Sequence, residues 1–280
     1  MPYVAEISRA RPGCIIFMID QSGSMNDSMA GAEPGKKKAD AVADAINRLL
    51  QNLVIKCSKG EGIRDYFHVG VLGYGAYVGS AYGGGLAGGG LVKTSELANN
   101  PLRVEERLKK NDDGAGGVVE QKVKFPVWFD PVAQGNTPGC RALGMVREML
   151  SKWIAHYGTS YPPIVINITD GEFTDGNPLP LAAEIHKLST SDGNVLLYNC
   201  HICAKGGPKI VYPNTNRDLP DEPARKLFQM TSALPGMVQV AAKAEGLNLE
   251  PGARGFALNA ELVDMIRFLD IGTRLGIDLR

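Results

Sequence analysis

Three short segments of the sequence carry oxygen-rich side chains of the kind that bind hard metal ions. In the run Asp-Gln-Ser-Gly-Ser, Asp20 offers a carboxylate, and Ser22 and Ser24 offer hydroxyls. Thr137, in Gly-Asn-Thr-Pro-Gly, and Asp170, in Ile-Thr-Asp-Gly-Glu, supply two further oxygen groups. Magnesium takes six oxygen ligands and usually keeps several waters, so few protein ligands suffice. The residue types therefore predict a site for Mg²⁺ or Mn²⁺, provided that the fold brings the three segments together.

Apolar runs of strand length alternate with helical patterns, which is typical of an α/β fold with a doubly wound, mostly parallel sheet flanked by helices. We expect strands at 14–19, 66–72, 122–129, 163–169 and 195–202, and helices at 39–53, 137–153, 181–188, 221–232 and 259–271. Asp20 and Asp170 each follow a predicted strand, and Thr137 opens a predicted helix. Ligands bind at the carboxyl ends of the strands in such sheets, so these residues are expected to lie near one another.

The chain is predicted to be a single domain over residues 1–280, with loop insertions at 75–120 and 204–220. The first insertion holds a glycine-dense segment and a charged stretch, with room for a short hairpin or helix. We expect its glycine-rich part to face a partner, so that residues 80–92 can be deleted without loss of folding.

Composition disfavours several classes of function and location. The sequence has 30 basic and 30 acidic residues, so net charge gives no long-range attraction to nucleic acid or anionic membranes. No apolar run approaches the roughly 20 residues of a membrane span, and the N-terminus lacks the pattern of a signal peptide. The five cysteines, an odd number, are read as reduced thiols. A cytoplasmic location is therefore predicted.

The five oxygen-bearing residues in this order resemble the metal-ion-dependent adhesion site (MIDAS) of von Willebrand factor A (vWA) domains. The resemblance implies a Rossmann-like fold in which Ser22 and Ser24 bind Mg²⁺ or Mn²⁺ directly. It implies that Thr137 binds directly or through water, and that Asp20 and Asp170 act mostly through bridging waters. It also implies an open coordination position for an Asp or Glu of a protein partner.

The assignment of the threonine has alternatives. Asp20 and Thr137 are farther apart in sequence than in compact vWA domains, and Thr94 and Thr159 are other candidates. Thr137 could also serve only as the N-cap of the following helix. Its Gly-Asn-Thr-Pro context favours Thr137 as the ligand.

A narrower resemblance concerns residues 170–176. This run is similar to the Thr-Asp-Gly-Glu-x-Thr-Asp run of small cytoplasmic bacterial vWA proteins, including those associated with tellurium resistance. It implies a signalling or stress system with a protein kinase and a PP2C-type phosphatase as partners. The alternative is a co-subunit of a MoxR- or chelatase-like AAA+ ATPase.

A binding role is favoured over catalysis. A magnesium-dependent phosphatase of the haloacid-dehalogenase type would need an aspartate at position 22, where this chain has Ser22. The sequence has no Gly-x-Ser-x-Gly elbow after a strand. The four histidines fall within strand or helix patterns, so no general base is evident in the site loops.

Other polar groups are predicted to be structural. Glu172, Asp175 and Asn26 are expected to be solvated loop residues rather than ligands. Cys200–Cys203 is predicted to be a core strand rather than half of a zinc site, since no second pair lies at a suitable spacing. Lys36–Lys38 is predicted to be a solvated helix start, although cations there oppose the helix dipole.

Overall fold

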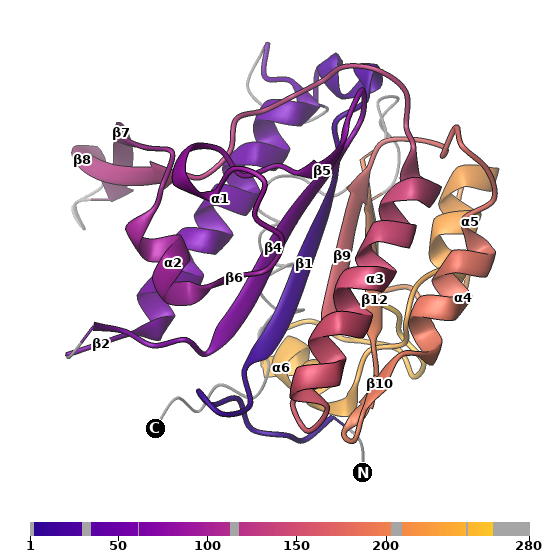
Figure 1. The fold of residues 1–280 in the computed structure, drawn as a ribbon. Helices are drawn as coiled ribbons and strands as arrows, with labels where there is room; N and C mark the ends of the chain where they lie inside the picture. The colour runs from indigo at the N-terminus through magenta and orange to yellow at the C-terminus, as the bar shows by residue number, and fades with distance from the viewer. Residues whose placement is uncertain are drawn as a thin grey trace.

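The computed structural model describes residues 3–29, 35–60, 62–112, 118–202, 209–244 and 246–259. Within them, eight strands form the central sheet in the order β13-β14-β12-β9-β1-β4-β5, with β6 paired to β4 (Figure 1). The strands are β1 (Gly13–Asp20), β4 (Phe67–Tyr74), β5 (Val78–Ser80), β6 (Val92–Lys93), β9 (Ile164–Thr169), β12 (Leu196–His201), β13 (Ile210–Val211) and β14 (Phe256–Leu258). The five central strands, from β14 to β4, run parallel, and β5, β6 and β13 pair antiparallel at the edges.

Helices cover both faces of this sheet. On one face lie α1 (Lys38–Cys57), α2 (Thr94–Asn99) and α6 (Gly236–Ala244), and on the other α3 (Gly139–Tyr157), α4 (Leu179–Lys187) and α5 (Glu222–Gln229). The predicted doubly wound, mostly parallel α/β architecture is confirmed. The helix expected at 259–271 lies outside the described residues, apart from Asn259, and so does Cys203.

The sequence of β1 explains its central position. All eight of its residues are buried. Ile15 and Phe17 enter the core beneath α1, and Ile16 and Met18 enter the core beneath α3. The unbroken run of apolar side chains from Cys14 to Ile19 suits a strand that is covered on both faces.

The order of the strands places a topological switch point at β1. The chain passes from β1 to β4 on one side and later returns to β9 on the other side. Asp20 ends β1, and Thr169 ends β9 immediately before Asp170. Loops diverge at such a point, which is where ligands bind in open parallel sheets.

Residues 75–120, expected to be an insertion, contain several regular elements. They form β5, the short 3-10 helix η2 (Gly84–Leu86), β6, α2, and β7 (Arg103–Asp112), which pairs with β8 (Val118–Val127). Tyr82 and Leu86 are buried, and the Tyr82 hydroxyl donates to the Val69 carbonyl at 3.2 Å. The burial of these side chains argues against the expectation that residues 80–92 can be deleted without loss of folding, because they fill part of the core.

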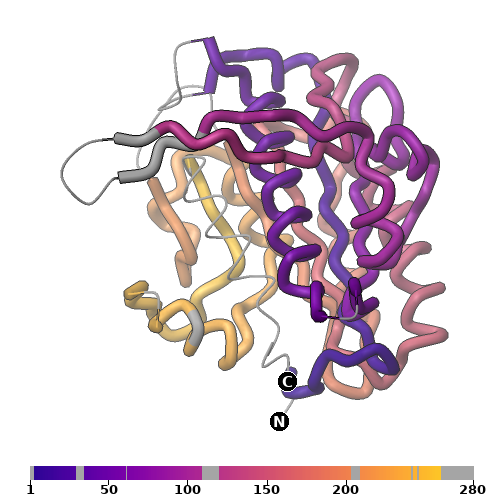
Figure 2. The backbone as a smooth tube through the Cα atoms, turned by 90° about the vertical axis from the view of Figure 1, so that its left-hand side faces the viewer, coloured from indigo at the N-terminus to yellow at the C-terminus, as the bar shows by residue number. Residues whose placement is uncertain are grey.

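The strand expected at 122–129 does not join the central sheet. It is the second strand of the β7–β8 ribbon, which lies against α1 (Figure 2). Lys122 and Lys124 are exposed while Phe125 and Val127 are buried, so one face of the strand is exposed to solvent. A central strand of the sheet would bury both faces.

Two other ribbons are short. β2 (Ser58–Lys59) pairs with β3 (Gly62–Ile63), and β10 (Ser189–Thr190) pairs with β11 (Gly193–Asn194). Of the stretch expected to be a loop at 204–220, the described part contributes β13 at the sheet edge. Cys200 is buried in β12, in the core as predicted. No helix in the described ranges is long and apolar enough to cross a membrane.

Candidate functional site

Asp20 lies at the carboxyl end of β1 and is fixed from two sides. Its side chain is buried, and its Oδ1 accepts a hydrogen bond from the Ser22 amide at 2.9 Å. Its Oδ2 accepts from the Thr169 hydroxyl at 2.6 Å. Burial raises the pKa of Asp20 above its ordinary value, and the nearby charge of Asp170 adds to the rise. A cation bound next to this carboxylate would offset both effects.

The hydroxyls of Ser22 and Ser24 link the β1 loop to the β9 loop. Their Oγ atoms are 3.1 Å apart, and the Ser24 hydroxyl donates to Asp170 Oδ1 at 2.7 Å. Ser22 is buried, whereas Ser24 lies exposed in the 3-10 helix η1 (Gly23–Asn26). The cluster is thus buried at Asp20 and Ser22 and exposed to solvent at Ser24.

Lys38 is a further member of the cluster. Its side chain is only 1% exposed, and its Nζ lies 2.7 Å from Asp170 Oδ2. The same Nζ lies 3.4 Å from the Ser24 carbonyl oxygen and 3.5 Å from the Asp27 carboxylate. The prediction of a solvated helix start is wrong at this position, because the ammonium is directed into the site. The cost of opposing the helix dipole is offset by the contact with Asp170.

Backbone hydrogen bonds join the loop before α3 to the loop after β1. The Gly23 amide donates to the Gly135 carbonyl at 2.9 Å, and the Gln134 amide donates to the Gln21 carbonyl at 2.7 Å. Gly135 has a φ of +85°, and a Cβ there would lie 2.5 Å from the Ala76 nitrogen. The close approach of the loop before α3 to Ala76, in the turn between β4 and β5, therefore requires glycine at position 135.

Thr137 lies two residues beyond this junction and is buried. Its amide donates to the Thr174 hydroxyl at 3.1 Å, and its carbonyl accepts from the Thr174 amide at 2.9 Å. The Thr137 segment is thus held against both the 20–24 loop and the 170–176 loop. The structure therefore brings the segments of all five predicted ligands to one edge of the sheet.

The cap of α3 comes from another residue. Pro138 occupies the N-cap position and makes no side-chain hydrogen bond there. The Asp175 carboxylate accepts from the amides of Cys140 at 2.9 Å and Arg141 at 2.8 Å. Asp175, expected to be only a solvated loop residue, therefore caps α3, and Thr137 does not.

The two alternative threonines lie away from this edge. The Thr94 hydroxyl donates to the Phe67 carbonyl at 2.9 Å, at the amino end of β4. Thr159 follows the last residue of α3, Tyr157, and a helix of that length spans roughly 28 Å. Of the three candidates, Thr137 is the one whose segment is hydrogen-bonded to the 20–24 loop and to the 170–176 loop.

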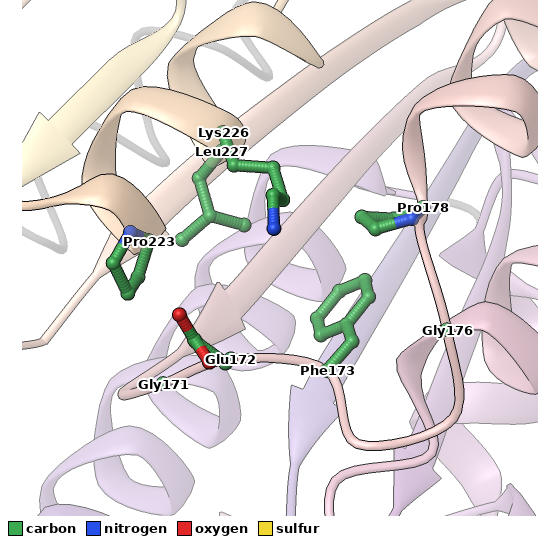
Figure 3. Close-up of a pocket in the computed structure, with 8 residues that line it drawn as sticks. All are labelled: Gly171, Glu172, Phe173, Gly176, Pro178, Pro223, Lys226 and Leu227. Carbon is green, nitrogen blue, oxygen red and sulfur yellow. The ribbon is translucent and has the colours of Figure 1, made fainter.

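A pocket opens next to the Asp170 loop (Figure 3). It is lined by two charged residues, Glu172 and Lys226, together with Gly171, Phe173, Gly176, Pro178, Pro223 and Leu227. Phe173 also packs edge-on against Tyr74, with ring centroids 5.9 Å apart. The pocket begins at the residue that follows Asp170, so it adjoins the polar cluster.

The donor set fits a hard divalent cation. Two carboxylates and the hydroxyls of two serines converge, with Thr137 in the adjoining loop, and all of their donor atoms are oxygen. Over the described part of the chain, no group of three or more His, Cys, Asp or Glu side chains is placed to hold a metal. Because the converging donor atoms are all oxygen, the donor set differs from that of metal sites rich in His and Cys.

Sequence reasoning missed Thr169 and Lys38. Thr169 is the last residue of β9, so its position next to Asp170 was a usable signal. Lys38 gave a weaker signal, an unfavourable charge at a helix start. Its partner, Asp170, is 132 residues away in sequence, which local spacing does not reveal.

Comparisons with known proteins found likenesses in structure. No protein-family model matches the sequence, and no curated protein matches it. Among solved structures, the chain is similar to the PilB minor pilin from Streptococcus sanguinis, with 9% identity, a TM-score of 0.45, and coverage of 96% of this chain and 63% of that one.

Two further structures have vWA-related descriptions. Proximal thread matrix protein 1 from the mussel byssus, described with a zinc-occupied MIDAS motif, is 16% identical with a TM-score of 0.44, covering 95% of this chain and 48% of that one. The vWF domain of the type V pili tip protein Mfa5 from Porphyromonas gingivalis is 15% identical with a TM-score of 0.31, covering 58% and 39%. This chain spans less than two thirds of each of the three.

Proposed function

We propose that this chain is a protein-binding module that ligates an acidic residue of a partner through a bound divalent cation, Mg²⁺ or Mn²⁺. The observation that carries the proposal is the pair of hydroxyls of Ser22 and Ser24, 3.1 Å apart, tied to Asp170 beside the buried Asp20. Mg²⁺ and Mn²⁺ are the cations that such oxygen ligands suit.

Each residue has a distinct role in this proposal. Ser22, Ser24 and Thr137 would hold the cation, and Asp20 and Asp170 would accept hydrogen bonds from its bound waters. When bound, the cation would supply positive charge and a coordination position for a carboxylate. Thr169 orients Asp20 by donating to its Oδ2. Because Asp20 is already fixed by two hydrogen bonds, little ordering would be needed when a cation binds.

The surroundings of the cluster support binding to a protein. Ser24 is exposed, so a ligand from outside can approach the hydroxyl edge. The pocket lined by Phe173, Glu172 and Lys226 starts next to Asp170 and offers a mixed polar and apolar recess for residues that flank the acidic one.

We propose binding without catalysis. His68, in β4, accepts from the Trp153 indole at 2.9 Å, and burial lowers the pKa of this imidazole. Ser232 and His186 come within 3.3 Å, but the Ser232 hydroxyl also accepts from the Leu197 amide. His68 and His186 thus make structural hydrogen bonds away from the cluster.

The finer assignment rests on the run at 170–176. We propose a cytoplasmic bacterial signalling or stress system with kinase and PP2C-type phosphatase partners, of the kind associated with tellurium resistance. The alternative is a co-subunit of a MoxR- or chelatase-like AAA+ ATPase. Neither assignment alters the proposed chemistry of the site.

The test is selection of peptides from a random display library, in parallel with Mg²⁺ and with EDTA. We expect the Mg²⁺-dependent peptides to share an Asp or Glu, and replacement of that residue by its amide to abolish binding. The Ser22→Ala variant should no longer bind these peptides. The Ser151→Ala variant, which changes an exposed serine on α3, should bind them as the wild type does. Recovery of peptides that bind equally well in EDTA would contradict the proposal.

A further inference from the structure

Lys38 is the feature of the cluster that the expected ligand set does not explain. We propose that Lys38 makes tight binding of a divalent cation conditional on an accompanying carboxylate ligand. The inference rests on the proposed function, since it concerns the same site. It adds the condition under which that site binds the cation tightly.

The contacts of Lys38 place its charge inside the cluster without replacing the cation. The Lys38 ammonium donates a hydrogen bond to Asp170 Oδ2 at 2.7 Å. The Ser24 hydroxyl donates to the other oxygen, Oδ1, at 2.7 Å. Its further contact within the cluster is the Ser24 backbone carbonyl, at 3.4 Å. The hydroxyl pair of Ser22 and Ser24 therefore stays available for a cation.

Burial strengthens the electrostatic interactions of the Lys38 ammonium with its neighbours. The side chains of Lys38 and Asp170 are each 1% exposed, so water screens the ammonium poorly. Asp27, at 3.5 Å, is 60% exposed, so solvent screens its charge. The electrostatics of the cluster are thus dominated by the charges of Asp20, Asp170 and Lys38.

The balance of these charges gives the rule. With both carboxyls ionised, two carboxylates and one ammonium leave the cluster with one net negative charge. A divalent cation alone would turn it into one net positive charge in a poorly solvated place, and a carboxylate ligand would restore neutrality. Without Lys38, the cation alone would already neutralise the cluster. With Lys38 present, the site is therefore electrically neutral only when it holds both the cation and an acidic ligand.

The test measures Mn²⁺ dissociation constants from the EPR signal of free Mn²⁺, in potassium chloride and in potassium acetate at equal ionic strength. Acetate is the carboxylate probe, its own weak complex with Mn²⁺ is corrected for, and acetamide is its neutral counterpart. We compare the wild type with Lys38→Met, which keeps the length of the apolar stem, and with Ser22→Ala. Lys36→Met is the matched control, because Lys36 pairs with Asp44 outside the cluster.

In the wild type, acetate should tighten Mn²⁺ binding several-fold, and acetamide should not. In chloride, Lys38→Met should bind Mn²⁺ at least about tenfold more tightly than the wild type, and it should gain little from acetate. Lys36→Met should match the wild type. Equal Mn²⁺ affinities of Lys38→Met and wild type in chloride, or an equal gain from acetate, would overturn the inference.

The failures can be told apart. If Ser22→Ala loses Mn²⁺ while Lys38→Met matches the wild type, the inference fails and the proposed cation site stands. If Ser22→Ala binds Mn²⁺ as the wild type does, both fail. Should Lys38→Met not fold by circular dichroism, Lys38→Gln replaces it. The wild-type comparison of acetate with acetamide stands in either case, and no difference between them would overturn the inference.

Discussion

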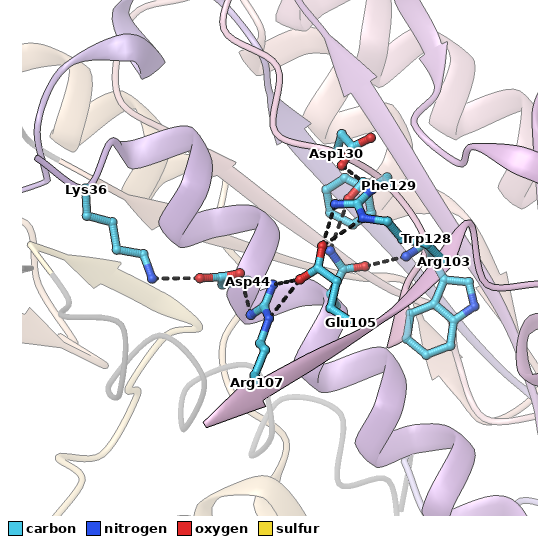
Figure 4. Close-up of polar contacts among 9 residues, drawn as sticks. Lys36, Asp44, Arg103, Glu105, Arg107, Trp128, Phe129 and Asp130 are labelled. Atoms are coloured by element: carbon cyan, nitrogen blue, oxygen red, sulfur yellow. Dashed lines mark hydrogen bonds and ion pairs between the residues drawn. The ribbon is translucent and has the colours of Figure 1, made fainter. Parts of the chain in front are cut away.

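Lys36 and Lys38 lie two residues apart at the start of α1, yet they belong to two different polar clusters. Lys38 is buried against Asp170 at the carboxyl edge of the sheet. Lys36 pairs with Asp44, which also pairs with Arg107 of the β7–β8 ribbon (Figure 4). From Arg107 the chain of ion pairs continues through Glu105 and Arg103 to Asp130.

The two clusters differ in exposure and in charge balance. Members of the ribbon cluster have side chains between 25% and 53% exposed, and three basic groups alternate with three acidic ones. Its charges satisfy one another, and such exposed pairs contribute little to stability. The sheet-edge cluster is buried except at Ser24, has one more carboxylate than ammonium groups at its centre, and presents convergent hydroxyls. The contrast shows that unmatched charge in a buried place, and not the number of ionic residues, marks the candidate ligand site.

The largest difference between the clusters is expected from the same substitution made in each. Asp20→Asn should weaken Mn²⁺ binding by about 10- to 100-fold, since Asp20 positions the waters and hydroxyls of the proposed site. Asp44→Asn, in the ribbon cluster, should leave Mn²⁺ binding unchanged. Titration in acetate buffer measures both. Equal losses in the two variants would remove the distinction.

A second prediction concerns how the ribbon is held to α1. The buried Asn47 side chain accepts from the Trp128 amide at 2.8 Å and donates to the Phe129 carbonyl at 3.1 Å. Asn47→Ala would leave both backbone groups unpaired, so we expect a loss of about 2–3 kcal/mol in the free energy of unfolding. Urea denaturation measures this loss.

The matched control for Asn47→Ala is Gln51→Ala, one turn further along α1. Gln51 donates to the Lys124 carbonyl at 3.2 Å in an exposed contact. Its removal should cost less than about 1 kcal/mol, because water can replace the lost hydrogen bond. If the two variants are equally destabilised, the buried clamp is not what fixes the ribbon.

The smallest expected effect is the acid dependence of the ribbon cluster. Partial burial alone would raise the pKa of Asp44, but the hydrogen bonds and charges of Lys36 and Arg107 outweigh it and lower the pKa below the ordinary 3.8. A lowered pKa contributes stability that is complete above pH about 4 and is lost as the pH falls through the lowered value.

Asp44→Asn should therefore be about 1 kcal/mol less stable than the wild type at neutral pH. This difference should shrink as the pH falls below about 4. Urea denaturation of both proteins at neutral pH and near pH 3 gives the comparison. A difference that stays constant with pH would show that the Asp44 charge does not stabilise the fold.

The sequence predicted well those parts of the molecule that depend on local pattern. The uninterrupted apolar run of β1 predicts a strand buried on both faces, and the positions of Asp20 and Asp170 at strand ends predict their proximity. The pattern at 122–129 predicts a strand, which is present as β8, but it does not predict that this strand pairs with β7 outside the central sheet, because pairing depends on partners that a local pattern does not specify.

The residues that the sequence could not reveal act through distant contacts. Lys38 meets Asp170 across 132 positions, and Asp175 caps α3 from 35 positions away. Each is an ordinary charged residue in its local context. Only the folded arrangement shows that one enters the candidate site and the other completes a helix end.

The central claim is tested most directly by calorimetric titration of Mg²⁺ into the chelator-stripped protein in acetate buffer. The account predicts one site in the wild type, its loss in Ser22→Ala, and its retention in Ser151→Ala, with all three proteins folded by circular dichroism. Mg²⁺ binding that survives in Ser22→Ala, or no binding by the folded wild type, would contradict a cation site at the carboxyl edge of the sheet.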